Sequence, residues 1–149
     1  MPADKAQTAA LLASPDDVEA QFYEALQLAD LDKLMAVWSD DDDVACVHPG
    51  GPRVIGHAAI RASFEAIFAN GAIPVQAHSV TRVQALGSAV HHVVERITLQ
   101  TEKGTQSAWV LCTNVYVKTT QGWRLLVHLA SPGGEQAGPP ERETPSTLH

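Results

Sequence analysis

The stretch that decides the fold is QSAWVLCTNVYVKTTQGWRLLVHLA, residues 106–130. Its β-branched and aromatic residues fall into two long runs, at 106–119 and 123–130, on either side of Gln121-Gly122. Runs of this composition joined by a short connection that contains glycine are typical of an antiparallel hairpin. Both faces of the first run carry apolar side chains, so neither face has the polar alternation expected of a surface exposed to water. We therefore expect a hairpin that is covered on both faces.

Two more runs of the same kind lie just upstream, at residues 75–86 and 89–100. Connections that contain glycine, Gly87-Ser88 and Lys103-Gly104, follow these runs. Short connections of this type favour neighbouring antiparallel strands. The second half of the chain therefore predicts a meander of four long strands.

The first half of the chain has a helical pattern instead. Ser14-Pro15 is a typical helix start, and apolar residues recur after it at three-to-four spacing. In chain order we expect a helix at residues 15–29, a short helix at 31–38, a small hairpin formed by 44–47 and 53–55, and a third helix at 57–69. Helices collected before a meander imply an α+β domain in which a curved, mostly antiparallel sheet wraps the helices on one face.

Length and composition limit the class of protein. A chain of 149 residues fits one domain, which we place at residues 14–131, between a flexible N-terminus at 1–13 and a disordered tail rich in proline and glycine at 132–149. The net charge of −7 argues against nucleic acid and anionic membranes as partners. No signal peptide or membrane-spanning run is evident. Cys46 and Cys112 lie in hydrophobic runs typical of buried free thiols, so we expect a cytoplasmic protein.

Three stretches of the chain resemble a known superfamily. They are ALQLADLDKLMAVWSDD at 25–41, HPGGPRVIGHAAIRASFEAIF at 48–68 and GWRLLVHLASPGG at 122–134. They resemble the nuclear transport factor 2-like superfamily, which includes SnoaL-like cyclases, ketosteroid isomerase, scytalone dehydratase and the association domain of calcium/calmodulin-dependent kinase II. The resemblance implies a cone-shaped, cystatin-like barrel of curved sheet around three N-terminal helices. It also implies a deep pocket between sheet and helices, and a homodimer formed through the outer sheet face.

Three positions invite comparison with ketosteroid isomerase. The resemblance places His48 at the general base of that enzyme, Asn114 at its oxyanion-hole acid and Phe22 at its phenol. Phe22 therefore lacks the hydroxyl that the phenol of that enzyme provides. Tyr23 is not expected to supply this hydroxyl instead, because neighbouring helix positions point about 100° apart. Two interpretations of His48 remain open: it is a pocket base, or it ends a strand and bonds to the turn. Asn114 is either a structural hydrogen-bonding residue or a pocket amide that awaits a ligand.

Further residues could line the pocket. Arg96 resembles an arginine in the pocket of the kinase association domain, but a register slip of one residue would exchange it with Glu95. His128 resembles a histidine in the last strand of that domain, and is otherwise a core residue. Four aromatic side chains would either close the pocket or fill the core: Phe22, Trp38, Phe64 and Tyr116.

The sequence predicts no metal site and no cofactor. The acidic run Asp40–Asp43 lacks the alternation and the glycine of a calcium loop, and His91-His92 point to opposite faces of a strand. Phosphate-binding and dinucleotide-binding motifs are absent from the sequence. Two functions remain. One is binding of a small organic ligand, with proton-transfer chemistry of isomerase, cyclase or dehydratase type by His48 and Asn114. The other is a non-catalytic association or ligand-binding domain.

Overall fold

The computed structural model describes residues 12–134, and the expected terminal segments lie mainly outside this range. The helices are α2 (Pro15–Leu28), α3 (Leu31–Met35) and α4 (His57–Phe68). The strands are β1 (Ala45–Val47), β2 (Arg53–Ile55), β3 (Val75–Gln84), β4 (Ser88–Thr101), β5 (Gly104–Thr119) and β6 (Gly122–Gly134). The predicted order of elements is confirmed.

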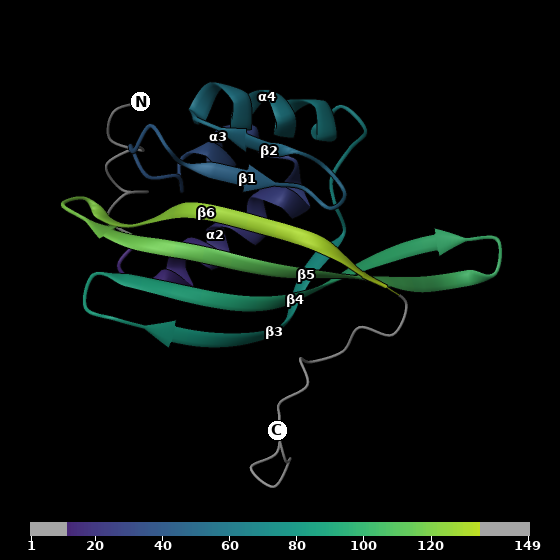
Figure 1. The fold of residues 1–149 in the computed structure, drawn as a ribbon. Coiled ribbons are helices and arrows are strands. Elements are labelled where there is room, and N and C mark those ends of the chain that lie inside the picture. Colours follow the sequence, from purple (N-terminus) through teal and green to yellow (C-terminus); the bar gives the residue numbers. More distant parts are fainter. Residues whose placement is uncertain (1–11, 135–149) are drawn as a thin grey trace, which may run out of the picture.

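The strands form one six-stranded sheet in the order β2-β1-β6-β5-β4-β3. Strand β1 pairs with β6 in parallel, and every other neighbouring pair is antiparallel. The predicted α+β class and curved, mostly antiparallel sheet are confirmed, although β2 and β3 remain as free edges and the sheet does not close. The helices lie on one side of it (Figure 1). We call the sheet face under the helices the covered face and the opposite one the outer face.

Helix α2 begins as its sequence predicts. Ser14 Oγ accepts a hydrogen bond from the backbone N–H of Asp17 at 3.2 Å, and Pro15 occupies the first turn. This cap satisfies an N–H that has no partner inside the helix. The helix buries one face, including Phe22 and Tyr23, against the sheet.

Helix α3 is shorter than predicted, because it ends at Met35 rather than at Trp38. Beyond it, Trp38 forms a parallel bridge with Leu125 of β6, and the Leu125 N–H donates to the carbonyl of Val37 at 2.7 Å. Pairing with the sheet requires an extended backbone, so it competes with a further helical turn.

Strand β6 is longer than predicted and continues to Gly134. Its last residues still pair with β5, and Pro132 lies opposite Val110. The register of this pairing is irregular between Trp109 and Val110. Proline is tolerated there because β1 pairs with β6 only as far as Leu129, which leaves one side of Pro132 without a neighbouring strand.

The core lies between the helices and the covered face. Apolar side chains from both layers fill it, among them Phe22, Ile60, Phe64, Val93 and Leu125. Large apolar side chains remain on the outer face, where Leu111 is 42% exposed and Leu129 is 38% exposed. The two faces of the sheet therefore differ, and only the covered one is packed within the described part of this chain.

Candidate functional site

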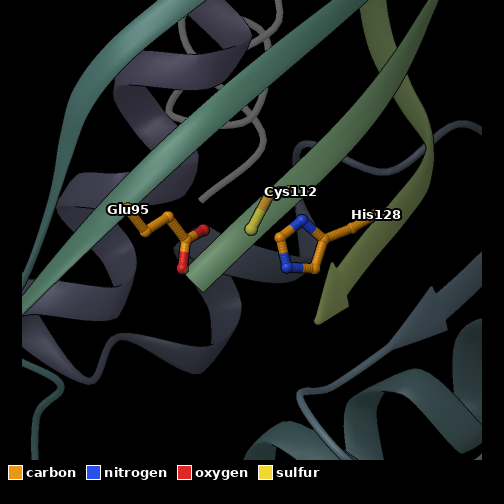
Figure 2. Close-up of side chains that lie close together, drawn as sticks. All are labelled: Glu95, Cys112 and His128. Carbon is orange, nitrogen blue, oxygen red and sulfur yellow. The ribbon is translucent and has the colours of Figure 1, made fainter. Parts of the chain in front are cut away.

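Five polar side chains gather on the covered face and form what we call the buried polar cluster. Because side chains alternate along a strand, one residue of β4, two of β5 and one of β6 point toward helix α2. Helix α2 contributes the fifth side chain. The members are Tyr23, Glu95, Cys112, Asn114 and His128, all of them buried. Figure 2 shows the Glu95 carboxylate, the Cys112 sulfur and the His128 ring close together.

Two short hydrogen bonds order this cluster. The Tyr23 hydroxyl donates to Glu95 Oε2 at 2.7 Å. His128 Nδ1 lies 2.6 Å from Asn114 Oδ1, and the two residues are direct partners in the β5–β6 register. Because an amide oxygen can only accept, the proton of the His128 ring is on Nδ1, and Nε2 keeps its lone pair. Tyr23 therefore belongs to the buried polar cluster, although its hydroxyl is bonded to Glu95.

Burial shifts the pKa of each titratable group of the cluster toward its uncharged form. Desolvation lowers the pKa of His128 to about 3, with a smaller contribution from His48. Desolvation also raises the pKa of Glu95, and it raises the pKa of Tyr23 well above 10, where the negative charge of Glu95 adds to the effect. The Cys112 thiol has a raised pKa for the same two reasons. Each shift follows from removing a charged form from water.

Asn114 is the least satisfied member of the cluster. Its Oδ1 accepts from His128, but its Nδ2 has no hydrogen-bond partner among the described residues, and the side chain is almost fully buried. Buried side-chain donors are nearly always paired, so such an exception requires an explanation. The indole Nε1 of Trp38 is also buried without a partner in this part of the chain.

His48 follows the last residue of β1 and is half-buried. Its Nε2 lies 2.9 Å from Ser63 Oγ of α4, and the Ser63 hydroxyl donates to the carbonyl of Ile60 at 2.7 Å. Because Ser63 has a single proton, its oxygen must accept from His48 Nε2–H, which leaves Nδ1 as the basic nitrogen. Burial lowers the pKa of His48. The ring is thus bonded to α4, while the His48 carbonyl accepts from Gly51 in the turn.

A row of aromatic rings connects His48 to the buried polar cluster. The His48 ring is 4.7 Å from Phe64, Phe64 is 6.3 Å from Phe22, and Phe22 is 4.8 Å from His128, measured between ring centroids. No hydrogen bond joins His48 to Asn114 within residues 12–134. The two residues predicted to work together therefore belong to one region, with apolar rings between them.

The other predicted aromatic residues are also buried in the core. Trp38 is part of the core, and Tyr116 lies at a second polar group, with its hydroxyl 3.5 Å from Glu19 Oε2 and its ring against His91. His91 Nδ1 is in turn hydrogen-bonded to Glu19 Oε2. Tyr116 thus shares the covered face with Asn114, as strand alternation predicts, but contacts a different set of groups.

Arg96 faces away from the buried polar cluster. Its neighbour Glu95 occupies the covered face, so the alternation of β4 puts Arg96 on the opposite one. There Arg96 Nε donates to Ser107 Oγ at 2.9 Å, and the guanidinium lies 5.9 Å from the centre of the Trp109 ring. Of the two neighbours that the sequence analysis considered for this face, Glu95 is the one that occupies it. Its position in a row with Ala89 and Val93 was the available signal.

The outer face carries an open hollow of about 740 Å³. Side chains of β3 to β6 and of β1 line it, including His92, Leu111, Thr113 and Leu129. This hollow lies on the sheet face opposite to the predicted pocket, whose expected position is filled by the core and the buried polar cluster.

Within residues 12–134, two groups of side chains could hold a metal ion, although the sequence predicted none. Glu95, Cys112 and His128 have ligand atoms that all lie within 4.8 Å of one another, and so do Asp16, Glu19 and His91. The first group joins three different strands, and the second joins two residues of α2 to one of β4, so sequence spacing alone could not have indicated either complete set. Both cysteines are free and buried, as predicted.

Comparison with known proteins identifies relatives of this chain. A family model of the SnoaL-like domain matches residues 16–133. A crystal structure from Thiobacillus denitrificans, provisionally assigned as a calcium/calmodulin-dependent protein kinase type II association domain, is similar with 35% identity and a TM-score of 0.75. The match covers 82% of this chain and 97% of that one. No curated protein matches.

More distant structures have the same architecture. A provisionally assigned dehydratase of the NTF2-like family from Streptomyces avermitilis shares 28% identity over 77% of this chain and 91% of its own, with a TM-score of 0.68. The CaMKII hub of S. rosetta shares 18% identity over 80% of this chain and 98% of its own, with a TM-score of 0.63, which supports the fold alone. Among the described residues, no helix is long and apolar enough to cross a membrane.

Proposed function

The chain belongs to the SnoaL-like domain family, and from this premise we propose that it binds a small, partly apolar organic molecule between its sheet and its helices. The observation that carries the proposal is the buried Nδ2 of Asn114, which lacks an acceptor among the described residues. A buried donor without a partner costs about 1–3 kcal/mol. A ligand oxygen that accepts from this amide would recover that free energy, and the rings of Phe22 and Phe64 would contact the apolar part of the ligand.

The proposed ligand enters beside His48, which is half-buried at the junction of β1 and α4. The ring of Phe64 contacts His48 on one side and belongs to the core on the other. A ligand that reaches both His48 and Asn114 must therefore displace this ring and the ring of Phe22 that lies beyond it.

The chemistry we propose for this site is proton transfer, of the kind that an isomerase, a cyclase or a dehydratase needs. His48 is neutral at pH 7 because burial lowers its pKa, and its Nδ1 has a free lone pair. It would take a proton from carbon, while Asn114 Nδ2 would donate to the oxygen on which negative charge develops. The Tyr23 hydroxyl lies in the same cluster, where it is bonded to Glu95.

A panel of alicyclic and aromatic ketones tests both steps. We expect at least one ketone to raise the midpoint of thermal unfolding, and we expect the protein to catalyse exchange of its α-protons for deuterium, measured by NMR in D2O. His48→Gln should slow this exchange by about 10²–10⁴-fold, the usual contribution of a general base. Asn114→Leu should weaken binding, because it removes the amide donor.

The matched control is His92→Gln, since His92 is exposed on the outer face. This variant should bind and exchange as the wild type does. A panel without any stabilising ketone, or exchange that is equally fast in His48→Gln, contradicts the proposed function.

A second function, assembly without catalysis, is favoured by the outer face. Leu111 and Leu129 stay exposed beside the open hollow, and a similar protein with 35% identity is assigned to an association domain. We propose a homodimer through the outer face, because burial of this apolar surface stabilises association. Light scattering coupled to size exclusion tests it, and a strictly monomeric chain at micromolar concentration contradicts it.

A further inference from the structure

Three side chains of the buried polar cluster have the chemistry and the spacing of a metal site. Glu95, Cys112 and His128 come from β4, β5 and β6, and their ligand atoms lie within 4.8 Å of one another (Figure 2). Ligands about 2.0–2.3 Å from a tetrahedral ion are about 3.3–3.8 Å apart, so small side-chain rotations would close the remaining distance. We propose that these three residues bind one Zn²⁺ ion, an inference that does not rest on the function proposed above.

The donor set indicates the kind of metal. A thiolate, an imidazole nitrogen and a carboxylate oxygen are the three ligand types that zinc binds in proteins, whereas calcium and magnesium require oxygen ligands alone. The thiolate of Cys112 and the carboxylate of Glu95 together supply two negative charges, and His128 is neutral. These charges balance a divalent cation, so the occupied site would carry no net charge into the core.

Hydrogen bonds already orient two of the three ligands. Asn114 Oδ1 accepts the Nδ1 proton of His128 at 2.6 Å, which leaves Nε2 as the nitrogen able to bind a metal. Histidine ligands in metal sites usually donate their other N–H to an acceptor in this way. Tyr23 donates to Glu95 Oε2, which leaves Oε1 without that bond. Asn114 and Tyr23 are thus positioning residues for the proposed ligands.

The second group of possible ligands is a weaker candidate. Asp16 forms an ion pair with Arg82 at 2.8 Å, and Glu19 is paired with His91. Both carboxylates already have hydrogen-bonded partners, and Asp16 is exposed. A cation would have to displace both pairs to bind there, so we assign the site to Glu95, Cys112 and His128.

Elemental analysis of the full chain, purified from medium with added zinc, tests the inference directly. We expect one zinc ion per chain. After removal of the zinc by chelation in denaturant, refolding with Co²⁺ should produce a thiolate-to-cobalt absorption band. Cys112→Ser should abolish that band and weaken zinc binding at least about tenfold, as should His128→Gln. Thermal unfolding of each variant reports whether it has folded.

The chain provides matched controls for both substitutions. Cys46 is also a buried free thiol, and it lies beside His48 rather than in the ligand set, so Cys46→Ser should keep the zinc and the cobalt band. His91→Gln removes a buried histidine of the second group and should likewise keep the zinc ion. Wild-type protein that holds no stoichiometric zinc, or binding that persists in Cys112→Ser or fails equally in Cys46→Ser, overturns the site.

One readout needs no variant and therefore does not depend on how a variant folds. Zinc should slow alkylation of Cys112 in the wild-type protein and leave alkylation of Cys46 unchanged, as measured by mass spectrometry of the two cysteine peptides. Equal alkylation of Cys112 with and without zinc overturns the proposal. This experiment measures only the effect of zinc on Cys112. Its outcome can therefore be distinguished from the outcome of the ketone experiments.

Discussion

Tyr23 of α2 and Tyr116 of β5 are both buried between the helices and the covered face, yet their hydroxyl groups make very different contacts. The Tyr23 hydroxyl donates to Glu95 at 2.7 Å, which is a normal O–H to oxygen distance. The Tyr116 hydroxyl is 3.5 Å from Glu19, so that interaction is weak. The first hydroxyl therefore fixes a buried carboxyl group, whereas the second mainly fills space.

This difference predicts unequal effects of removing each hydroxyl. Tyr23→Phe should lower the free energy of unfolding by about 1–3 kcal/mol, because it removes the hydroxyl that donates to the buried carboxyl of Glu95. Tyr116→Phe, the matched control, should lower it by less than about 1 kcal/mol. Urea unfolding followed by circular dichroism measures both values. Equal losses would show that Tyr23 does not stabilise Glu95.

His48 predicts a dependence of stability on pH. Burial lowers its pKa in the folded protein, whereas the unfolded chain keeps a pKa near 6.5. As the pH falls below about 6.5, the unfolded state therefore takes up a proton first, and the folded state loses stability until the pH reaches the folded pKa. Above that window this group has no effect. The proposed proton transfer should decline on the acid side, at a pH below 6.5.

Urea unfolding at pH 7.5, 6.5 and 5.5 measures this contribution. The wild type should lose more stability between pH 6.5 and 5.5 than His48→Gln does, and His92→Gln should behave as the wild type. Parallel pH profiles of the wild type and His48→Gln would contradict the prediction.

Single residues differ in how far their positions could be predicted from sequence. Strand alternation correctly placed Cys112, Asn114 and Tyr116 on one face, because the period of two holds along β5. The partner of Asn114 could not be predicted, since the β5–β6 register shifts between Val115 and Tyr116 and so depends on an irregularity that alternation does not show. The bond from His48 to Ser63 depends on the packing of α4 against β1, for which a local pattern gives no signal.

Gly56 joins β2 to α4 and determines how this helix begins. Its φ of 92° and ψ of 156° lie in a region that is essentially restricted to glycine. A Cβ at this position would be 3.7 Å from the carbonyl oxygen of Asp42, which is an ordinary contact, so the backbone conformation is the main constraint. Because α4 carries Ser63, this turn also positions the hydrogen bond to His48.

Gly56→Ala should therefore lower the free energy of unfolding by about 1–3 kcal/mol, through backbone strain alone. Gly87→Ala is the matched control: its Cβ would meet nothing within 4 Å, and its φ is not positive. We expect this control to change stability by less than about 0.5 kcal/mol. Denaturant unfolding measures both variants, and a Gly56→Ala variant as stable as the control would show that the turn relaxes freely.

The boundaries of elements were less predictable than their order. Composition and glycine-containing connections correctly predicted the four long strands, because hairpins depend on local chemistry. The ends of α3 and β6 were predicted wrongly, since both depend on distant pairing, of Trp38 with Leu125 and of Pro132 with Val110. Local propensity was overruled there by the sheet.

For the whole molecule, the two faces of one sheet have separate roles in these proposals. The covered face carries the buried polar cluster, which the helices shield from water, and the proposed proton transfer and metal binding are placed there. The outer face carries an apolar hollow, where Leu111 and Leu129 remain accessible. Apolar residues on both faces of the strands predicted that both faces of the sheet would be covered. Within the described part of a single chain, the helices cover one of these faces. A second copy of the chain is the simplest way to cover the other.

A single charge on the outer face should therefore prevent dimerisation without unfolding the chain. Leu129→Glu would place a carboxylate at the centre of the proposed interface, where it would lose its contact with water and have no partner. Leu86→Glu is the matched control, since Leu86 is 99% exposed in the β3–β4 connection and distant from the hollow. Light scattering should report a monomer for Leu129→Glu and a dimer for Leu86→Glu and the wild type, with similar circular dichroism spectra. A dimer that survives Leu129→Glu would mean that the copies associate through another surface.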